Sequence, residues 1–257
     1  MSPISASYPA ILRAVGIASM VAAALALASP ALADPASATV QTTLGAPGAR
    51  QADFGREQPA PEVRHVADWV ARSRDNGSTP FLIVDKRHAR LFVFNADAHL
   101  VANAPVLLGL AKGDDTVPGI GDKKIADIKP DERTTPAGRF VADSGPDLRG
   151  EEVVWIDYDA AVSMHRVITN NPKERRLERL ATPTYLDNRI SYGCINVPRA
   201  FFDRYVAPIF TDGKQAPVYV MPETKTLRAV FPGYDGPDAA PVRAASSGTH
   251  ARLASMR

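Results

Sequence analysis

The sequence holds one residue with an obvious capacity for covalent chemistry, a lone cysteine. Cys194 lies in the segment RISYGCINVP, which runs from Arg189 to Pro198. An unpaired cysteine is a reactive thiol, one half of a bond to another molecule, or a small buried hydrophobe. A cysteine nucleophile needs a base, donors for the oxyanion and room for the substrate carbonyl. Gly193 leaves such room, so we take this segment as the candidate reactive centre.

Backbone amides next to the cysteine are candidate oxyanion donors. The N–H groups of Tyr192, Gly193 and Cys194 can converge on one point, and a single donor of this kind is worth roughly 2.7–4 kcal/mol in well-studied enzymes. A helix that begins near Pro198 would place its N-terminal dipole close by and favour the thiolate. The segment therefore has two of the three parts that a cysteine nucleophile needs.

The third part is a base, and histidine is the expected residue. His165 ends the apolar run AAVSMH and precedes Arg166, which predicts a partly buried strand position. In isolation such a histidine is more often structural, but the cysteine motif downstream favours a catalytic role. The remaining histidines are expected to be solvated, in a helix, two turns and the C-terminal tail: His65, His88, His99 and His250.

The surrounding pattern predicts short strands with a few helices. The stretch FLIVDKRHARLFVFNADAHLVANAPVLLG has the apolar runs and polar turns of a three-stranded meander. Further strands are predicted at GRFVADS, EEVVWIDYD, AVSMHRV and APVYVMP. Helices are predicted in PEVRHVADWVARSRDNG, where Asn76-Gly77 stops the pattern, and at NPKERRLERL and PRAFFDRYVAPIF. The fold class is mainly β, with a catalytic domain over residues 79–222.

The two ends of the chain differ in composition from this domain. Residues 1–33 have the apolar run and the Ala31-Leu32-Ala33 site of a secretory signal peptide, with a retained membrane anchor as the alternative. Residues 34–78 are predicted to be a Pro/Ala-rich linker with a short helix, and residues 223–257 a flexible tail. The protein is therefore expected to be exported to the periplasm or cell wall, with membrane contact only if the leader is retained.

Composition places the chain among ordinary globular proteins. Hydrophobic residues make up 45% and charged residues 23% of the chain, and the formal net charge is +2. Nothing in this balance indicates a nucleic-acid partner. Asp157 and Asp159 could suggest a metal site, but two aspartates that flank Tyr158 at a strand end are better explained by solvation, so no metal or other cofactor is expected.

The order of these motifs resembles a known family. MHR followed by ISYGCIN is similar to the His…Ser-x-Gly-Cys signature of the L,D-transpeptidase (YkuD-like) catalytic domain. TTPAGRF resembles the family's Thr-Pro-x-Gly-x-Phe segment, and the meander resembles its opening strands. The resemblance covers roughly residues 79–222. It implies a β-sandwich or mixed-sheet catalytic domain and a cysteine acyltransferase that acts on the stem peptides of peptidoglycan.

The resemblance also implies roles for individual residues. Cys194 matches the nucleophile and His165 the general base. Gly193 and Tyr192 match the backbone oxyanion positions, and Ser191 matches the motif serine, which we expect to form local hydrogen bonds. In such an enzyme the thiolate attacks a tetrapeptide stem, releases D-Ala and passes the acyl group to an acceptor. The acceptor is the amine of another stem, giving a 3-3 cross-link, a lysine of a wall-anchored protein, or water.

The sequence departs from the family pattern in three places. Arg166 stands where the family often has glycine, and Tyr192 where it often has histidine. The segment between His165 and Cys194 is longer than usual and contains NNPKERRLERLATPTYLDNR. This insertion is either a helical lid or a solvated helix.

Substrate-binding side chains are expected beside the motif and in the insertion. As a lid, the insertion would offer Arg175, Arg176 and Arg179 to carboxylates of the stem peptide. The candidate substrate-binding residues are Ser191, Asn196, Arg166 and Arg176.

Rival functions fit less well. A sortase would show Leu-x-Thr-Cys before the thiol, a NlpC/P60 peptidase places cysteine before histidine, and a serine hydrolase needs Gly-x-Ser-x-Gly. Two alternatives remain open, an L,D-carboxypeptidase that uses water as the acceptor and a non-catalytic cell-wall-binding protein with a degenerate site.

Overall fold

The computed structural model describes residues 50–238 of the chain. The predicted signal peptide, residues 34–49 of the predicted linker and residues 239–257 of the predicted tail lie outside this range. Among the described residues, no helix has both the length and the apolar character needed to cross a membrane.

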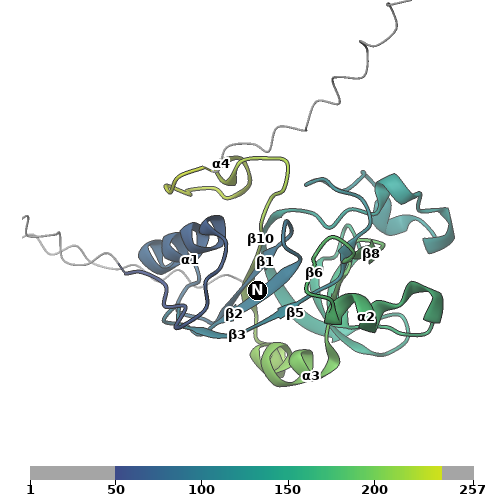
Figure 1. The fold of residues 1–257 in the computed structure, drawn as a ribbon, viewed down its shortest axis with the longest axis horizontal. Coiled ribbons are helices and arrows are strands. Elements are labelled where there is room, and N and C mark those ends of the chain that lie inside the picture. Colours follow the sequence, from purple (N-terminus) through teal and green to yellow (C-terminus); the bar gives the residue numbers. More distant parts are fainter. Residues whose placement is uncertain (1–49, 239–257) are drawn as a thin grey trace, which may run out of the picture. The chain divides into compact units, whose positions relative to one another are not determined.

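A mixed sheet of eight strands forms the centre of the described chain (Figure 1). Its order is β3-β2-β1-β10-β5-β6-β7-β9, and the pairs β1–β10 and β7–β9 are parallel while the others are antiparallel. A two-stranded parallel sheet, β4–β8, lies beside it. The strands are β1 (Phe81–Asp85), β2 (Arg90–Phe94), β3 (Leu100–Pro105), β4 (Leu108–Gly109), β5 (Gly138–Pro146), β6 (Glu152–Asp157), β7 (Val162–Arg166), β8 (Arg189–Ser191), β9 (Ile195–Val197) and β10 (Ala216–Val220). The predicted mainly β, mixed-sheet fold and the meander are confirmed.

Helices are few and mostly short among the described residues. They are α1 (Pro61–Ser73), α2 (Arg176–Ala181), α3 (Arg199–Phe201) and α4 (Leu227–Val230). The segment predicted as one helix after the cysteine motif is helical but irregular, because α3 continues as a π turn over Phe202–Val206 and a 3₁₀ turn over Ala207–Ile209. Further 3₁₀ turns lie at Ile120–Asp122, Ile125–Asp127, Pro130–Glu132, Pro172–Glu174 and Thr211–Gly213.

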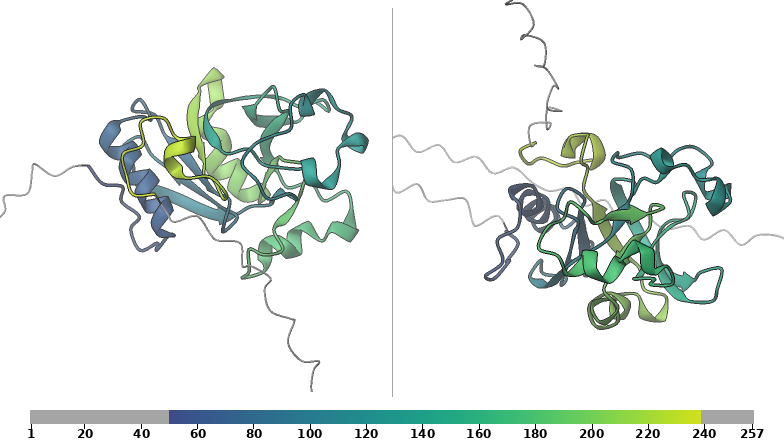
Figure 2. Two further views of the ribbon diagram at one scale, coloured as in Figure 1. Left: turned by 90° about the horizontal axis from the view of Figure 1, so that it is seen from above. Right: turned by 45° about the vertical axis from the view of Figure 1, so that its right-hand side comes forward.

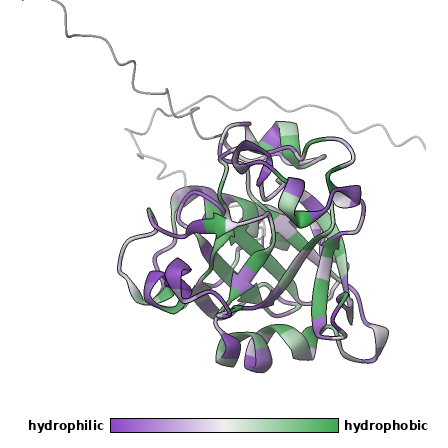
Figure 3. Cartoon of the chain, turned by 90° about the vertical axis from the view of Figure 1, so that its right-hand side faces the viewer, coloured by the Kyte–Doolittle hydropathy of each residue, from purple (hydrophilic) through white to green (hydrophobic). Residues whose placement is uncertain are grey.

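Two hydrophobic cores lie on opposite faces of β1. Successive side chains of a strand point to opposite faces, so Leu82 and Val84 enter one core while Phe81 and Ile83 enter the other. The first core joins the strands around β7 and β9 to the helical segment that follows Pro198. The second lies beneath α1 and α4, which are side by side in Figure 2. Figure 3 shows the apolar strands inside and the polar loops and helix faces outside.

The fold extends beyond both predicted domain boundaries. Residues 223–238 were expected to be tail, yet Phe231 and Tyr234 are buried and pack against Trp69 of α1. The Trp69 indole donates to the carbonyl of Gly233 at 3.0 Å. Upstream, Asp53 of the expected linker forms a β-bridge with His99. Isolated aromatic anchors in Gly- and Pro-rich segments give no periodic signal, which is why sequence patterns do not reveal them.

Candidate active site

Two adjacent parallel strands bring the candidate base to the candidate nucleophile. His165 on β7 pairs in register with Asn196 on β9, and Cys194 immediately precedes β9. Met164 and Ile195 are register partners on these two strands, and both side chains are fully buried in the first hydrophobic core, which fixes the register. His165 is therefore on a partly buried strand, as its sequence context predicts.

The Cys194 thiol lies among three polar groups of the β7 region. Its Sγ is 3.7 Å from the Ser163 hydroxyl and 3.8 Å from the carbonyl oxygen of Ala161. Burial by itself would raise the pKa of this thiol. A hydrogen bond and the charge of His165, together with hydrogen bonds from Ser163, outweigh burial and hold the pKa of Cys194 below its ordinary value. The site therefore raises the fraction of thiolate, the nucleophilic form, above that of an ordinary thiol.

A backbone carbonyl fixes the orientation of the His165 ring. The ring Nδ1 lies 2.8 Å from the carbonyl oxygen of Arg166. A carbonyl oxygen only accepts, so Nδ1 carries the proton and Nε2 keeps its lone pair in the neutral ring. Nε2 is thus the atom available to take the thiol proton.

The backbone at Gly193 would be strained with any residue other than glycine. Its φ is +135°, and a Cβ there would lie 2.9 Å from the carbonyl oxygen of Thr134. The Thr135 hydroxyl donates to the Gly193 carbonyl at 2.7 Å and accepts from the Gly109 amide at 2.8 Å. The loop that carries the thiol is therefore anchored to the TTPAGRF segment.

Ser191 forms the local hydrogen bonds expected of it. Its hydroxyl donates to the Cys194 carbonyl at 2.6 Å and accepts from the Gly193 amide at 3.2 Å. This uses one of the three amides that the sequence suggested for the oxyanion. Within residues 50–238, the amides of Tyr192 and Cys194 donate to no protein acceptor, so these two remain available to a substrate oxygen.

The four remaining candidates all make contacts, but with the protein itself. Asn196 accepts from Arg176 at 2.7 Å and donates to the Cys194 carbonyl at 3.3 Å. Arg166 pairs with Asp203 at 2.6 Å. Tyr192 is 37% exposed and lies under the guanidinium of Arg133, 3.9 Å from its ring centre.

The three arginines of the insertion were expected to face a substrate, but in the structure each contacts the protein itself. Arg176 is directed inward to Asn196, Arg179 donates to the carbonyls of Glu174 and Asp187, and Arg175 pairs with Glu178. A guanidinium has five donors, and nearby carbonyl oxygens and carboxylates satisfy them at short range. The insertion is thus pinned to the site through Arg176 and Asn196.

Ser163 and Thr135 contact the site but were not predicted to do so. Ser163 lies two residues before His165 on the same strand, so strand alternation places both side chains on one face. That spacing is a signal that the sequence contains. The sequence gives no signal for the contact of Thr135, because its partner Gly193 is far away in sequence.

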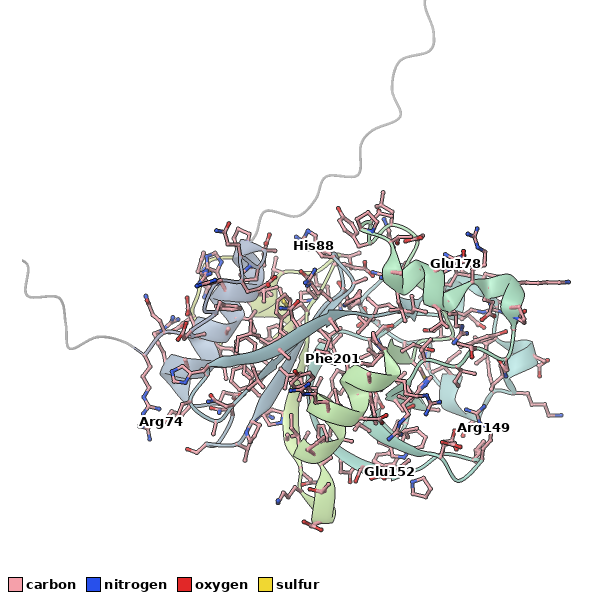
Figure 4. All side chains as sticks on the ribbon, turned by 60° about the horizontal axis from the view of Figure 1, so that its bottom comes forward. Arg74, His88, Arg149, Glu152, Glu178 and Phe201 are labelled. Atoms are coloured by element: carbon pink, nitrogen blue, oxygen red, sulfur yellow. The ribbon has the colours of Figure 1, made fainter. Side chains whose placement is uncertain are left out.

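A groove of about 400 Å³ opens beside His165. Its lining carries charges of both signs, and Figure 4 shows Arg149 and Glu152 at this edge of the molecule. The charged lining residues are Asp147, Arg149, Glu151, Glu152, Arg166 and Arg199. Such a lining suits a ligand that carries both amines and carboxylates.

The described residues contain no group of three or more His, Cys, Asp or Glu side chains arranged for a metal. Asp157 accepts from the amide of Ala160 at 3.0 Å, which closes the turn after β6.

Comparisons with known proteins find solved structures that are similar to part of this chain. No protein-family model and no curated protein matches the chain. An L,D-transpeptidase from Mycobacterium smegmatis is similar at 16% identity and a TM-score of 0.32, over 55% of this chain and 58% of that one. The L,D-transpeptidase LdtMt1 in complex with imipenem is similar at 14% identity and a TM-score of 0.33, over 56% and 59%.

A third solved structure is a fused zinc-dependent amidase/peptidase/peptidoglycan-binding-domain protein from Clostridium acetobutylicum. It is 18% identical with a TM-score of 0.35, over 64% of this chain and 65% of that one. The chain thus spans less than two thirds of the length of each of these structures.

Proposed function

We propose that this chain is a peptidoglycan acyltransferase of the L,D-transpeptidase type, with Cys194 as its nucleophile. The observation that carries the proposal is the pairing of a thiol of lowered pKa with a histidine whose Nδ1 is held by a backbone carbonyl. This pairing has the arrangement of nucleophile, base and orienting group that covalent catalysis needs. The resemblance of four sequence segments to the family, in the right order, supports the substrate class.

In the first step His165 Nε2 takes the proton from Sγ. The sulfur attacks the carbonyl carbon of the third residue of a tetrapeptide stem, and a C–S bond forms. The oxyanion accepts from the amides of Tyr192 and Cys194. Gly193 lies between these two amides, and its positive φ, which glycine adopts without strain, sets the backbone that presents them.

In the second step the C–N bond to the terminal D-Ala breaks. Protonated His165 returns its proton to the departing amine, and a thioester remains on Cys194. An acceptor amine then attacks the thioester, loses a proton to His165 and releases the thiolate. No metal or organic cofactor takes part in these steps.

The groove beside His165 is a candidate site for the acceptor. Its three carboxylates and three arginines suit an acceptor that carries both an amine and a carboxylate, such as a second stem peptide. A lysine of a wall-anchored protein is the other amine acceptor. With water in place of the amine, the same thioester would give L,D-carboxypeptidase activity. The proposed place of action is the cell wall, which the protein would reach through the predicted leader.

Intact mass spectrometry of the leaderless protein tests the proposal. Incubation with a tetrapeptide muropeptide should release D-Ala, and a carbapenem should give a one-to-one adduct. Both should disappear in Cys194→Ala, and the new muropeptide product should identify the acceptor. A folded wild-type protein that gives neither adduct nor D-Ala would leave the non-catalytic wall-binding function as the better account.

A further inference from the structure

A second groove, of about 430 Å³, lies apart from the Cys194–His165 site. It is enclosed by residues 57–60, by the turn between β1 and β2, and by the loop that follows α2. In Figure 4, His88 of that turn and Glu178 of α2 lie on the same side of the molecule. The groove shares no lining residue with the groove beside His165, and the proposed chemistry uses none of its side chains.

One buried side chain in this groove has an unused acceptor. Asn188 lines the groove and is 2% exposed. Its Nδ2 donates to the Val106 carbonyl at 3.0 Å, which identifies the other atom as Oδ1. Within the described part of the chain this Oδ1 has no hydrogen-bond partner. A buried carbonyl without a donor costs about 1–3 kcal/mol. This oxygen has no exposed surface, so an N–H or O–H of a ligand removes that cost only if the Asn188 side chain turns toward the groove.

An aromatic ring and an oriented donor lie across the same groove. Tyr185 is 44% exposed, and its ring contacts the His88 ring at 5.0 Å between centroids. His88 Nδ1 pairs with Asp85 at 2.7 Å, which directs Nε2 away from that carboxylate. An exposed ring next to fixed donors and acceptors suits a ligand that has both apolar faces and polar edges.

The charges of the groove are already paired with one another. Asp85 pairs with His88, and Arg90 lies 3.7 Å from Glu57. A phosphate or a metal cation would need an excess of one sign, which this lining does not provide. The matching ligand is neutral, with hydroxyls, an amide N–H and flat C–H faces, and this is the chemistry of an N-acetylated sugar.

We propose that this groove binds the N-acetylated glycan strand that carries the stem peptide, an inference that rests on the proposed function. Asn188 leads directly into β8 and from there to Cys194. The adjacent amides of Leu107 and Leu108 donate to the carbonyls of Asn196 and Asn188, each at 2.9 Å, so Asn188 lies close to β9. A stem of three residues reaches about 10 Å, which is the order of this separation. One strand can therefore lie in the groove while its stem approaches the thiol.

Binding of stem-free tetra-N-acetylchitotetraose, followed by NMR titration and calorimetry, tests the inference without catalysis. We expect saturable binding to the leaderless wild type and to Cys194→Ala. Tyr185→Ala should lose about tenfold in affinity, which corresponds to about 1.4 kcal/mol. Tyr158→Ala is the matched control, because Tyr158 is also an exposed tyrosine but lies outside the groove. A cello-oligosaccharide, which lacks the acetamido N–H, should bind more weakly.

Absence of saturable binding to the wild type, or equal losses in the two tyrosine variants, would overturn the inference. A second readout is kinetic. Tyr185→Ala should raise KM for glycan-linked stems and leave KM for a free tetrapeptide unchanged. Glycan binding without any acylation would overturn the proposed function alone, whereas acylation without glycan binding would overturn the groove assignment alone.

Discussion

Two histidines of this chain are oriented in the same way but by different partners. His165 Nδ1 is held by a backbone carbonyl at 2.8 Å, whereas His88 Nδ1 is held by the Asp85 carboxylate at 2.7 Å. The hydrogen bond to Asp85 is the main cause that raises the pKa of His88, ahead of the opposing effect of burial. His165 instead faces a thiol, and it helps to lower the pKa of Cys194 against the opposing effect of burial.

The comparison shows that the surroundings decide what a histidine can do. A carboxylate partner stabilises the imidazolium, which suits a structural or ligand-binding donor. A neutral carbonyl fixes the tautomer without adding charge, which leaves the ring free to exchange a proton with a nucleophile. The two sites also differ in a second group, because Ser163, two residues before His165, hydrogen bonds to the Cys194 thiol.

The largest expected effect distinguishes the two histidines directly. His165→Gln should slow acylation of Cys194 by roughly 10²–10⁴-fold, because the general base is lost. His88→Gln should change the acylation rate of a free tetrapeptide less than twofold. Mass-spectrometric acylation rates, with circular dichroism as a check on folding, measure both. Equal losses in the two variants would contradict the assignment of His165 as base.

The next effect concerns the backbone that presents the thiol. Gly193→Ala should reduce both acylation and stability, since φ is +135° and the added Cβ would meet the Thr134 carbonyl. We expect a loss of about 1–3 kcal/mol in the free energy of unfolding. Gly213→Ala is the control, because Gly213 also has positive φ (+71°) but no atom lies within 4 Å of the added Cβ. Urea unfolding should show a clearly smaller loss for Gly213→Ala.

A smaller effect is expected where the insertion meets the site. Arg176→Ala removes the 2.7 Å hydrogen bond to Asn196, and a bond to a charged donor is worth about 1.5–3 kcal/mol. Because Asn196 also contacts the Cys194 carbonyl, acylation should slow several-fold. Arg175→Ala should have no measurable effect on the acylation rate, since that side chain is 70% exposed. Similar rates in the two variants would show that the insertion does not position the site.

The smallest effect is a pH dependence of stability. The pKa of His88 is raised in the folded protein, so its pair with Asp85 stabilises fully below the pKa of an unfolded histidine. That contribution is lost as pH rises through the folded pKa. His88→Ala should therefore destabilise the protein more at pH 5 than at pH 9. Urea unfolding at the two pH values measures the difference. Equal losses at pH 5 and pH 9, or a larger loss at pH 9, would contradict the ion pair.

The sequence anticipated the parts of the molecule that have local signals. Alternating apolar residues identified the meander, and the run that ends at His165 identified its strand. The lone cysteine and the glycine before it marked the candidate nucleophile loop, because an unpaired cysteine suggests a reactive thiol and glycine permits an unusual backbone conformation.

Contacts between distant residues could not be read in the same way. Lys86 is fully buried and pairs with Asp114 at 2.9 Å, and Asp114 in turn accepts from the amides of residues 223–225. Paired charges of this kind resemble solvated surface residues in a sequence. The contact between Arg176 and Asn196 is of the same type, since it depends on how the insertion folds back onto β9.

The pH dependence of Cys194 alkylation tests the central claim most directly. Iodoacetamide rates from pH 4 to 10 report the apparent pKa of the thiol in the wild type, His165→Gln and His88→Gln. We expect a pKa below that of an ordinary thiol in the wild type and in His88→Gln. In His165→Gln the pKa should rise above that of the wild type, because the effect of His165 is lost and only the hydrogen bonds from Ser163 still oppose burial. The same pKa in all three proteins would contradict a Cys194–His165 pair and, with it, the proposed acyl-enzyme chemistry.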